Sequence, residues 1–189
     1  MPAAKRISKE AIIDAAEAVL RTGGFEAINA RSVAKALGCS TQPIYLTFRN
    51  MEELKSALTQ RAIEQHTRRV RASLRAHEGC DSRYSSYGMG FVQFAAQEKQ
   101  LFRWLYLEDN QPGRHQEDVL EPEIIRTVMD EFGYDEVTAR AFHRDMTYYS
   151  YGLAILANTG HLALTETELR EAFRREFRAL AAYYGCLLY

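Results

Sequence analysis

The stretch of sequence that decides the fold covers residues 38–54 and reads GCSTQPIYLTFRNMEEL. A proline stands in the middle of a segment whose apolar residues otherwise suit a short helix. Inside a helix, proline removes a hydrogen bond and clashes with the preceding turn, at a cost of about 3 kcal/mol. In the first turn this cost disappears, because the N–H groups there have no partner within the helix. The sequence therefore predicts that a helix begins close to Pro43.

The start of this short helix is expected between Ser40 and Pro43. With Ser40 as the N-cap, Pro43 takes the third helical position, and the Ser40 hydroxyl accepts a hydrogen bond from the N–H of Gln42. A start at Gln42 or Pro43 stays open, because the residue before a proline is biased away from the α region. In both cases Thr41, Gln42 and Pro43 form a short, stiff tip.

A second short helix precedes this tip, and a long helix follows it. Asn29 is expected to cap a helix over residues 30–37, which Gly38 ends. Asn50 begins a helix over residues 51–77 through a variant of the capping box. Two short helices joined by a glycine-containing turn predict a helix-turn-helix. The second helix of that motif would lie in the major groove of DNA, with its N-terminal residues against the base edges.

The remaining chain also has the pattern of helices, which predicts an all-α fold class with about nine helices. Cap residues and apolar spacing place the further helices at residues 8–22, 82–97, 98–109, 122–132, 136–159 and 166–184. Pro122 suits the first turn of its helix, and residues 110–115 are expected to be a loop. No segment of useful length alternates like a strand, and no repeat or low-complexity tract occurs.

The composition is ordinary for a soluble protein: the 189 residues are 47% apolar and 26% charged. This length suits one domain, or a small domain joined to a larger one. No apolar run approaches the roughly 18 residues that span a bilayer, and the N-terminus lacks the apolar centre of a signal peptide. Cys39, Cys80 and Cys186 are too scattered for a disulfide framework or a zinc site. We therefore expect a reduced, cytoplasmic protein without a membrane partner, a metal or a cofactor.

The charge is distributed unevenly along the chain, although the net charge is only −1. Residues 1–75 carry a net charge of +6, and residues 76–189 carry a net charge of −7. A basic N-terminal part on an acidic body is typical of a chain that touches phosphate at one end only. Random segregation of charge is the alternative explanation.

Residues about 8–55 resemble the DNA-binding domain of the tetracycline-repressor (TetR-like) transcription regulators. The order that carries the resemblance is Ala34, Leu37, Gly38, Ser40, Ile44, Tyr45, Phe48 and Leu54 at their present spacing, supported by Ala15-Ala16 and Gly24-Phe25. The rest of the chain agrees with that family only in its length and helical pattern. The resemblance implies a helix-turn-helix domain at residues 1–50, a connecting helix at 51–80, and a larger ligand-binding and dimerisation domain at 81–189.

The same resemblance implies a ligand-responsive transcriptional regulator. We expect a homodimeric repressor that binds a palindromic operator in double-stranded DNA and is released by a small apolar or aromatic effector. The effector would favour one arrangement of the C-terminal domain, move the long helix and so shift the DNA-binding helices.

Nine residues are expected to contact DNA, from their chemistry and from the resemblance: Lys5, Arg6, Arg31, Ser40, Thr41, Gln42, Pro43, Tyr45 and Asn50. Gln42 can pair with adenine through its amide. By resemblance, Tyr45 contacts a phosphate or sugar, although simple packing of its ring stays open. Arg31 reaches a guanine or a phosphate, or else belongs to a solvated face. The family usually carries a lysine where this chain has Met51. The absence of that lysine is expected to remove one phosphate contact per subunit.

The C-terminal domain offers candidate residues for dimerisation and for ligand binding. The apolar stripes of the last two helices supply the expected dimer contacts, namely Phe142, Met146, Leu153, Leu156, Leu169, Phe173, Phe177 and Leu180. In a symmetric pair these helices would form a four-helix bundle. A crowd of aromatic residues beside small ones supplies the expected ligand site, namely Phe91, Phe94, Phe102, Trp104, Tyr148, Tyr149 and Gly152. Packing in the core is the alternative for most of these aromatic side chains.

Two other classes of protein were weighed against a regulator. An enzyme is disfavoured, because the five histidines show no metal-ligand spacing and no glycine-rich phosphate loop occurs. Glu-x-x-His, which a di-iron helical bundle needs, is also absent. A helical adaptor that uses the N-terminal helices for protein contacts is the second alternative, and the basic arm at Lys5 and Arg6 argues against it.

Overall fold

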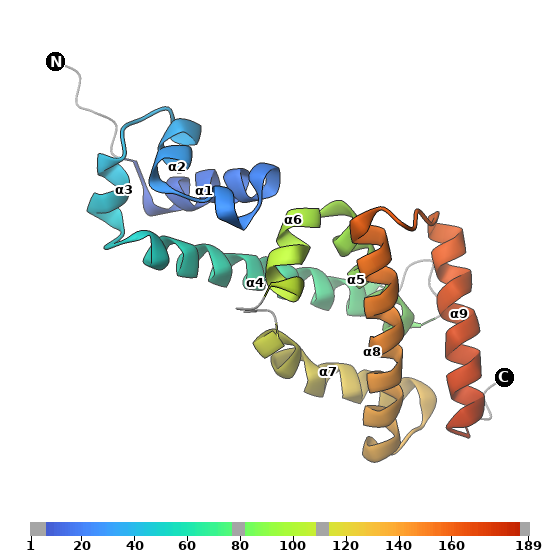
Figure 1. Cartoon of the computed structure of the whole chain (residues 1–189). Coiled ribbons are helices and arrows are strands. Elements are labelled where there is room, and N and C mark those ends of the chain that lie inside the picture. Colours follow the sequence, from blue (N-terminus) through green and yellow to red (C-terminus); the bar gives the residue numbers. More distant parts are fainter. Residues whose placement is uncertain (1–6, 77–81, 109–113, 186–189) are drawn as a thin grey trace. The chain divides into compact units, whose positions relative to one another are not determined.

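The computed structural model describes residues 7–76, 82–108 and 114–185. Within these ranges the chain forms helices and no strands, which confirms the all-α fold class (Figure 1). The elements in chain order are α1 (Lys9–Gly23), the 3-10 turn η1 (Phe25–Ala27), α2 (Ala30–Leu37), α3 (Gln42–Thr47), α4 (Met51–Ala76), α5 (Arg83–Gln97), α6 (Lys99–Phe102), the π-helical turn η2 (Arg103–Leu107), α7 (Arg114–Phe132), α8 (Glu136–Thr159) and α9 (Glu166–Tyr183). None of these helices has the length and apolar composition that crossing a membrane requires.

Helix α7 differs from its prediction. It begins at Arg114, so Pro122 lies inside the helix rather than in its first turn. Residues 110–113 of the expected loop fall outside the described residues. The ring of Pro122 is exposed, so water can bond to the carbonyl group that the proline leaves without an N–H donor. The prediction was wrong because an exposed proline can be tolerated within a helix that packs through its other face.

The contacts within the chain divide it into two compact units. The first comprises Met1–Gln65 and Gln100–Pro112, and the second comprises His66–Lys99 and Gly113–Tyr189. Helix α4 contributes its first part to one unit and its last part to the other. The predicted boundary between residues 80 and 81 lies outside the described residues.

The first unit buries the apolar faces of its short helices around α1. Among its fully buried side chains are Ile12, Ala16, Leu20, Val33, Ile44, Phe48, Leu54, Leu58, Phe102 and Leu105. Local signals place the helix ends. Asn29 and Ser32 form a reciprocal capping box at the start of α2. Gly38 ends that helix with φ 67°, a left-handed conformation that suits glycine.

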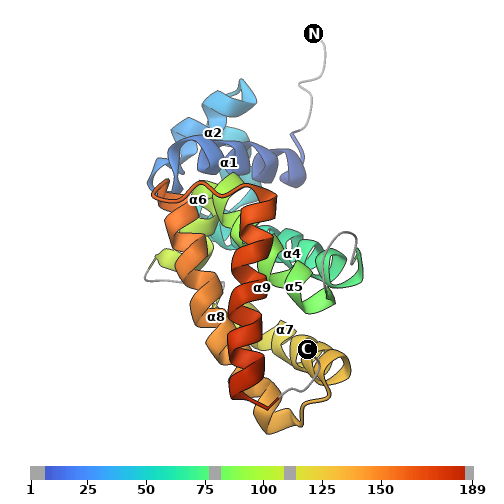
Figure 2. The same cartoon turned by 90° about the vertical axis from the view of Figure 1, so that its right-hand side faces the viewer.

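The second unit is built around the packing of α5 against α8. Helices α8 and α9 run antiparallel beside each other, and α7 packs on α5 and α8 (Figures 1 and 2). Asn158 of α8 is buried, and its Nδ2 donates hydrogen bonds to the carbonyl oxygens of Ala95 at 2.9 Å and Lys99 at 3.0 Å. These bonds tie the end of α5 to α8, because carbonyls at a helix end lack partners within the helix.

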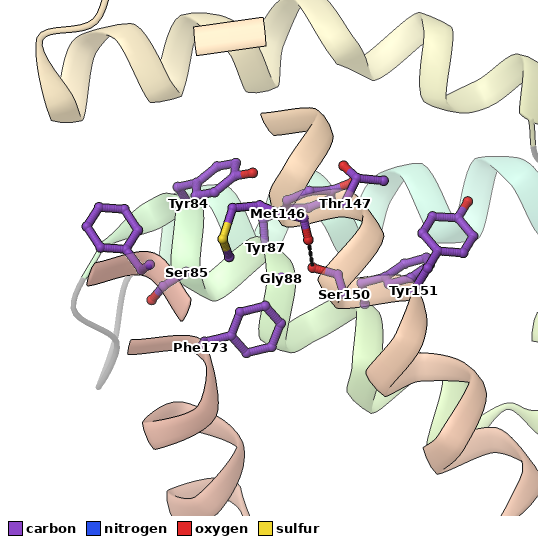
Figure 3. A pocket seen from close by; sticks show the side chains of 11 residues that line it. Tyr84, Ser85, Tyr87, Gly88, Met146, Thr147, Ser150, Tyr151 and Phe173 are labelled. Atoms are coloured by element: carbon purple, nitrogen blue, oxygen red, sulfur yellow. Dashed lines mark hydrogen bonds between the residues drawn. The ribbon is translucent and has the colours of Figure 1, made fainter. Parts of the chain in front are cut away.

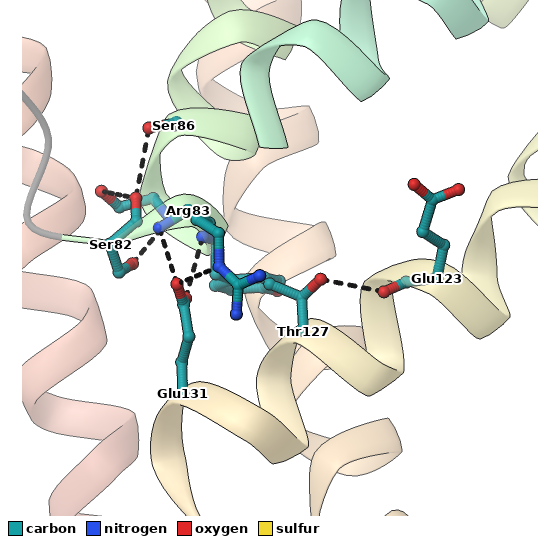
Figure 4. A network of polar contacts seen from close by, with 8 residues as sticks. Ser82, Arg83, Ser86, Glu123, Thr127 and Glu131 are labelled. Carbon is teal, nitrogen blue, oxygen red and sulfur yellow. Dashed lines mark hydrogen bonds and ion pairs between the residues drawn. The ribbon is translucent and has the colours of Figure 1, made fainter. Parts of the chain in front are cut away.

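The start of α5 is held by a carboxylate from α7 (Figure 4). Glu131 accepts hydrogen bonds from the backbone N–H groups of Arg83 at 2.9 Å and Tyr84 at 3.1 Å. The Arg83 side chain donates a third bond from Nε, also at 2.9 Å. Ser82 caps the next free donor by accepting from the N–H of Ser85. The first turn of α5 is therefore anchored by both local and long-range acceptors.

Candidate nucleic-acid interface and ligand cavities

Helix α3 presents a small exposed surface because its opposite face is buried. Ile44 and Phe48 are each 1% exposed and pack into the first unit. Tyr45 is 54% exposed and Leu46 is 79% exposed. Gln42, at the first position of the helix, is exposed as well. Polar, aromatic and aliphatic side chains therefore stand together on the outer face of one short helix, within reach of a partner surface.

The proline of this helix occupies its second position, where it removes no helical hydrogen bond. The predicted cap is wrong: Thr41, not Ser40, is the N-cap residue, and it makes no side-chain capping bond. Thr41 has helical backbone angles, φ −74° and ψ −14°, and its carbonyl accepts from the N–H of Ile44 at 3.1 Å. The alternative start at Gln42 is confirmed. Because proline presets the helical φ, the helix begins without a capping side chain, and the exposed Ser40 hydroxyl has no capping role.

The other predicted DNA contacts are placed as follows. Arg31 is exposed in the first turn of α2, and Asn50 is exposed immediately before α4. The Oδ1 of Asn50 accepts from the N–H of Glu53 at 2.9 Å, and the Glu53 carboxylate accepts from the N–H of Arg49 at 2.7 Å. The capping-box variant thus closes through Arg49 rather than through the backbone of Asn50. Lys5 and Arg6 lie outside the described residues.

Leu46 is a candidate that the prediction from sequence missed. Ile44 and Phe48 are four residues apart and form a buried face, and residues 42, 45 and 46 lie on the opposite side of the helix. The signal was therefore present, but an exposed leucine was not considered as a functional side chain. An aliphatic group at this place suits contact with the methyl group of thymine.

The profile of the bacterial regulatory proteins of the tetR family matches residues 12–58. These residues include the buried face of α1, the two short helices and the start of α4. Residues 12–58 therefore form a helix-turn-helix domain of the tetR family.

Solved structures share the fold of this chain over nearly its whole length. A protein of unknown function from Rhodococcus sp. RHA1 has 17% identity and a TM-score of 0.70, covering 97% of this chain and 98% of that one. The multidrug binding protein EbrR, solved with malachite green, has 18% identity and a TM-score of 0.59, covering 91% and 96%. The fatty acid degradation regulator FadR from Bacillus halodurans has 19% identity and a TM-score of 0.57, covering 96% of each chain. None of the curated proteins compared with the chain matches it significantly.

The second unit contains a cavity among α5, α8 and α9, which we call the aromatic cavity (Figure 3). Its described lining is uncharged: Tyr84, Ser85, Tyr87, Gly88, Phe91, Met146, Thr147, Ser150, Tyr151, Phe173 and Phe177. The volume is about 20 Å³, enough for a single water molecule. A small-molecule ligand would therefore have to displace side chains of the lining.

Most of the predicted ligand residues lie away from this cavity. Phe91 lines it, whereas Phe94 packs on the ring of His66 with centroids 4.6 Å apart. Phe102 and Trp104 belong to the first unit, where Trp104 stacks on Phe25. The burial of Phe102 and Trp104 follows from core packing, which is the alternative that the sequence leaves open.

The predicted ligand residues of α8 are placed on other surfaces. Tyr148 is 68% exposed, and Gly152 is exposed. Tyr149 is partly buried, and its hydroxyl donates to the carbonyl of Ala172 at 3.3 Å. The neighbouring Tyr151 and Ser150 line the aromatic cavity instead (Figure 3). The predicted residues of α8 are therefore shifted by one or two positions from the residues that line the cavity.

A partly buried hydrogen bond borders the aromatic cavity. The hydroxyl of Tyr84 and the Nδ1 of His143 are 2.8 Å apart. Burial lowers the pKa of His143 from its ordinary value of 6.5 to about 4, and burial raises the pKa of Tyr84. The histidine is therefore neutral at pH 7, and the phenol is protonated, so the Tyr84 hydroxyl can donate to Nδ1. Among the described residues, no cluster of His, Cys, Asp and Glu could hold a metal ion.

Several predicted dimer residues are buried inside the chain itself. Phe142, Met146, Leu169 and Phe173 are each at most 4% exposed. A second copy cannot reach them, so their assignment to a dimer surface is corrected: they form the core between α5, α7, α8 and α9. Leu153, Phe177 and Leu180 are partly buried, and Leu156 is 43% exposed. Of the eight predicted residues, Leu156 is therefore the best placed for contact with another protein.

Proposed function

We propose that the chain is a ligand-responsive transcriptional regulator that binds a palindromic DNA operator as a homodimer. The observation that carries the proposal is the exposed face of α3, with Gln42, Tyr45 and Leu46 outward, in a domain matched by the tetR profile. A two-fold dimer places two such helices in successive major grooves, so the operator is a palindrome. Gln42 reads a base edge, Leu46 contacts a thymine methyl, and Tyr45 contacts the backbone.

Arg31 and Asn50 position the domain on the phosphates. The Arg31 side chain is exposed, and its backbone N–H already bonds the Asn29 side chain, which fixes the start of α2. The Oδ1 of Asn50 caps α4, which leaves its amide NH₂ as the group available to donate to a phosphate. Contacts of this kind set register and affinity rather than sequence preference.

The dimer surface is formed by the exposed sides of α8 and α9. These sides carry Tyr148, Gly152, Ile155 and Leu156 on α8, and Ala179, Ala182 and Tyr183 on α9. On α8, Tyr148 and Leu156 each lie four residues from Gly152, and Ile155 lies three residues from it, so the four share one face of that helix. An effector that binds the second unit would act on DNA through α4, a long helix to which both units contribute.

The proposal is tested by selecting DNA duplexes from a random pool with the full-length protein at low and at moderate salt. We expect a palindrome whose half-sites lie about one helical turn, or a multiple of it, apart. The variant Gln42→Ala should keep its melting temperature and lose about 1–3 kcal/mol of discrimination at one position of each half-site. Gln60→Ala, an exposed glutamine on α4, is the matched control. Failure to enrich any palindrome at either salt concentration would overturn the proposal.

A further inference from the structure

A second cavity of the second unit differs from the aromatic cavity in its charge. It has a volume of about 400 Å³ and lies between the start of α5, the end of α7 and one side of α9. Three arginines line it, Arg170, Arg174 and Arg178, above a floor that includes Met89 and Phe173. No acidic side chain belongs to its described lining. We call this cavity the arginine groove.

The arginines form a row because they are four residues apart on α9. Arg170 pairs with Glu166 at 2.8 Å, and Arg174 pairs with Glu171 at 2.7 Å. Both glutamate side chains are exposed and neither lines the groove. Exposed ion pairs of this kind contribute only about 0–1 kcal/mol. An anion bound in the groove can therefore replace Glu166 and Glu171 as the partner of these arginines at little cost in free energy.

Arg170 also holds a donor that the rest of the described chain leaves without an acceptor. Its Nε is buried and makes no hydrogen bond to any described residue. A buried N–H without a partner costs about 1–3 kcal/mol, because the group has lost its water. A carboxylate or phosphate oxygen in the groove would give the Nε an acceptor once the Arg170 side chain turns toward it. The guanidinium would then present two parallel donors to the anion.

The floor of the groove suits an apolar group. Met89 is 3% exposed and Phe173 is 2% exposed. Phe173 also lines the aromatic cavity, together with Ser85 and Phe177, so the two cavities share a wall. Figure 3 shows the Phe173 ring at this wall, and a Cβ added to Gly88 would lie 2.7 Å from its Cε1. A ligand in the groove would thus press on side chains that close the aromatic cavity.

We propose that the arginine groove binds an amphipathic anion, with a carboxylate or phosphate head on the arginine row and an apolar body against Met89 and Phe173. The role of this anion as the effector rests on the proposed function, whereas its binding does not depend on DNA.

The test measures binding to the full-length protein by calorimetry in the absence of DNA. The probes are 2-naphthoate, 2-naphthyl phosphate and the neutral 2-naphthamide, which share one ring system and differ in the head group. We expect both anions to bind at least about tenfold more tightly than the amide, since a charge-assisted bond is stronger than a neutral one. The stronger of the two anions identifies the head group. Equal affinity for the amide and both anions, or no binding of any probe at millimolar concentration, would overturn the proposal.

A pair of variants locates the binding in the groove. The double variant Arg170→Gln/Arg174→Gln should weaken binding of the anions about tenfold or more and leave the amide unchanged. Arg175→Gln is the matched control, because Arg175 is an exposed arginine of the same helix that does not line the groove. An equal loss in the control would place the anion elsewhere and contradict the proposal. Should the double variant fail to fold, the comparison of acid and amide on the unmodified protein decides the matter.

A separate DNA-binding measurement distinguishes this inference from the proposed function. If the anion binds but leaves the affinity for the selected operator unchanged, the groove stands and its effector role is refuted. If no operator is found at all, calorimetry still decides whether the groove binds anions.

Discussion

At the scale of single residues, the outward face of α3 is a consequence of what the same helix buries. Ile44 and Phe48 are four residues apart, so their burial fixes the rotation of the helix about its axis. That rotation exposes Gln42, Tyr45 and Leu46 together. Pro43 sits at the second position without loss of a helical hydrogen bond and limits the freedom of the first turn. The exposed side chains are thus presented from a stiff backbone.

A substitution at Met51 would test whether the start of α4 contacts a DNA phosphate. It is the first residue of α4 and is only partly buried, so a longer cationic side chain can be accommodated there. We expect Met51→Lys to add one phosphate contact per subunit and to steepen the dependence of log Kd on log salt by about 0.9 per contact. Fluorescence anisotropy with the selected operator across a salt series measures this slope. Met51→Gln, of similar length without charge, should keep the original slope, and an unchanged slope for the lysine variant would refute the contact.

His143 predicts how stability depends on pH. Its pKa is lowered by burial from 6.5 to about 4 in the folded chain, so the unfolded chain binds more protons between these values. The contribution of His143 is therefore fully present above about pH 6.5 and is lost as the pH falls to about 4. We expect His143→Gln, which can still accept from Tyr84, to flatten the fall in the free energy of unfolding over this window. Urea unfolding at several pH values measures it, with the exposed His161→Gln as the control. If both variants fall as steeply as the unmodified chain, the assignment to His143 is wrong.

At the scale of the elements, close approach of α5 and α9 depends on a glycine. A Cβ added at Gly88 would lie 2.7 Å from Cε1 and 3.1 Å from Cζ of Phe173, a buried ring that has little room to move. Gly152 on α8 is exposed, and no described atom beyond its own helix lies within 4 Å of such a Cβ. Packing therefore explains the lack of a side chain at Gly88 but not at Gly152.

These glycines form a matched pair of variants. We expect Gly88→Ala to lower the free energy of unfolding by about 1–3 kcal/mol, because overpacking pushes α9 from α5. Gly152→Ala should raise it by about 0.5–1 kcal/mol, because alanine restricts the unfolded chain and favours the helix. Urea unfolding monitored by circular dichroism measures both. A stabilising effect of Gly88→Ala would contradict the packing of Phe173 on α5.

At the scale of the whole molecule, the proposed dimer predicts different roles for two exposed leucines. Leu156 on α8 is 43% exposed, and Leu164, in the turn before α9, is 36% exposed. Only Leu156 belongs to the proposed dimer surface. We expect Leu156→Glu to shift the protein toward monomers and to lower its affinity for the palindrome, since two half-sites are no longer bound together. Leu164→Glu should do neither. Analytical ultracentrifugation reports the assembly state, and a dimer of undiminished stability in the Leu156 variant would exclude this face.

The sequence by itself determined the helices and the helix-turn-helix, because their signals are local. Asn29, Gly38 and Thr165 act on backbone groups within four or five residues, so their effects can be read from neighbouring letters. The tetR-like pattern was recognised for the same reason, since it lies within one continuous segment. Ser40 shows where local sequence signals are insufficient. The sequence was compatible with two starts of α3, and the structure has the later one, with Thr41 as the N-cap.

Only the tertiary structure decided which faces of the C-terminal helices are buried. Helices α8 and α9 carry apolar residues on more than one side, so periodicity cannot say which side meets a neighbour in the same chain. Phe142 and Phe173 were predicted to face a second copy and are buried within the chain, whereas Tyr148 was predicted to enclose a ligand and is 68% exposed. The arginine groove has the same origin. Its row on α9 is visible in the sequence, but its floor joins Met89 to Phe173, and a contact across so many residues exists only once the chain has folded.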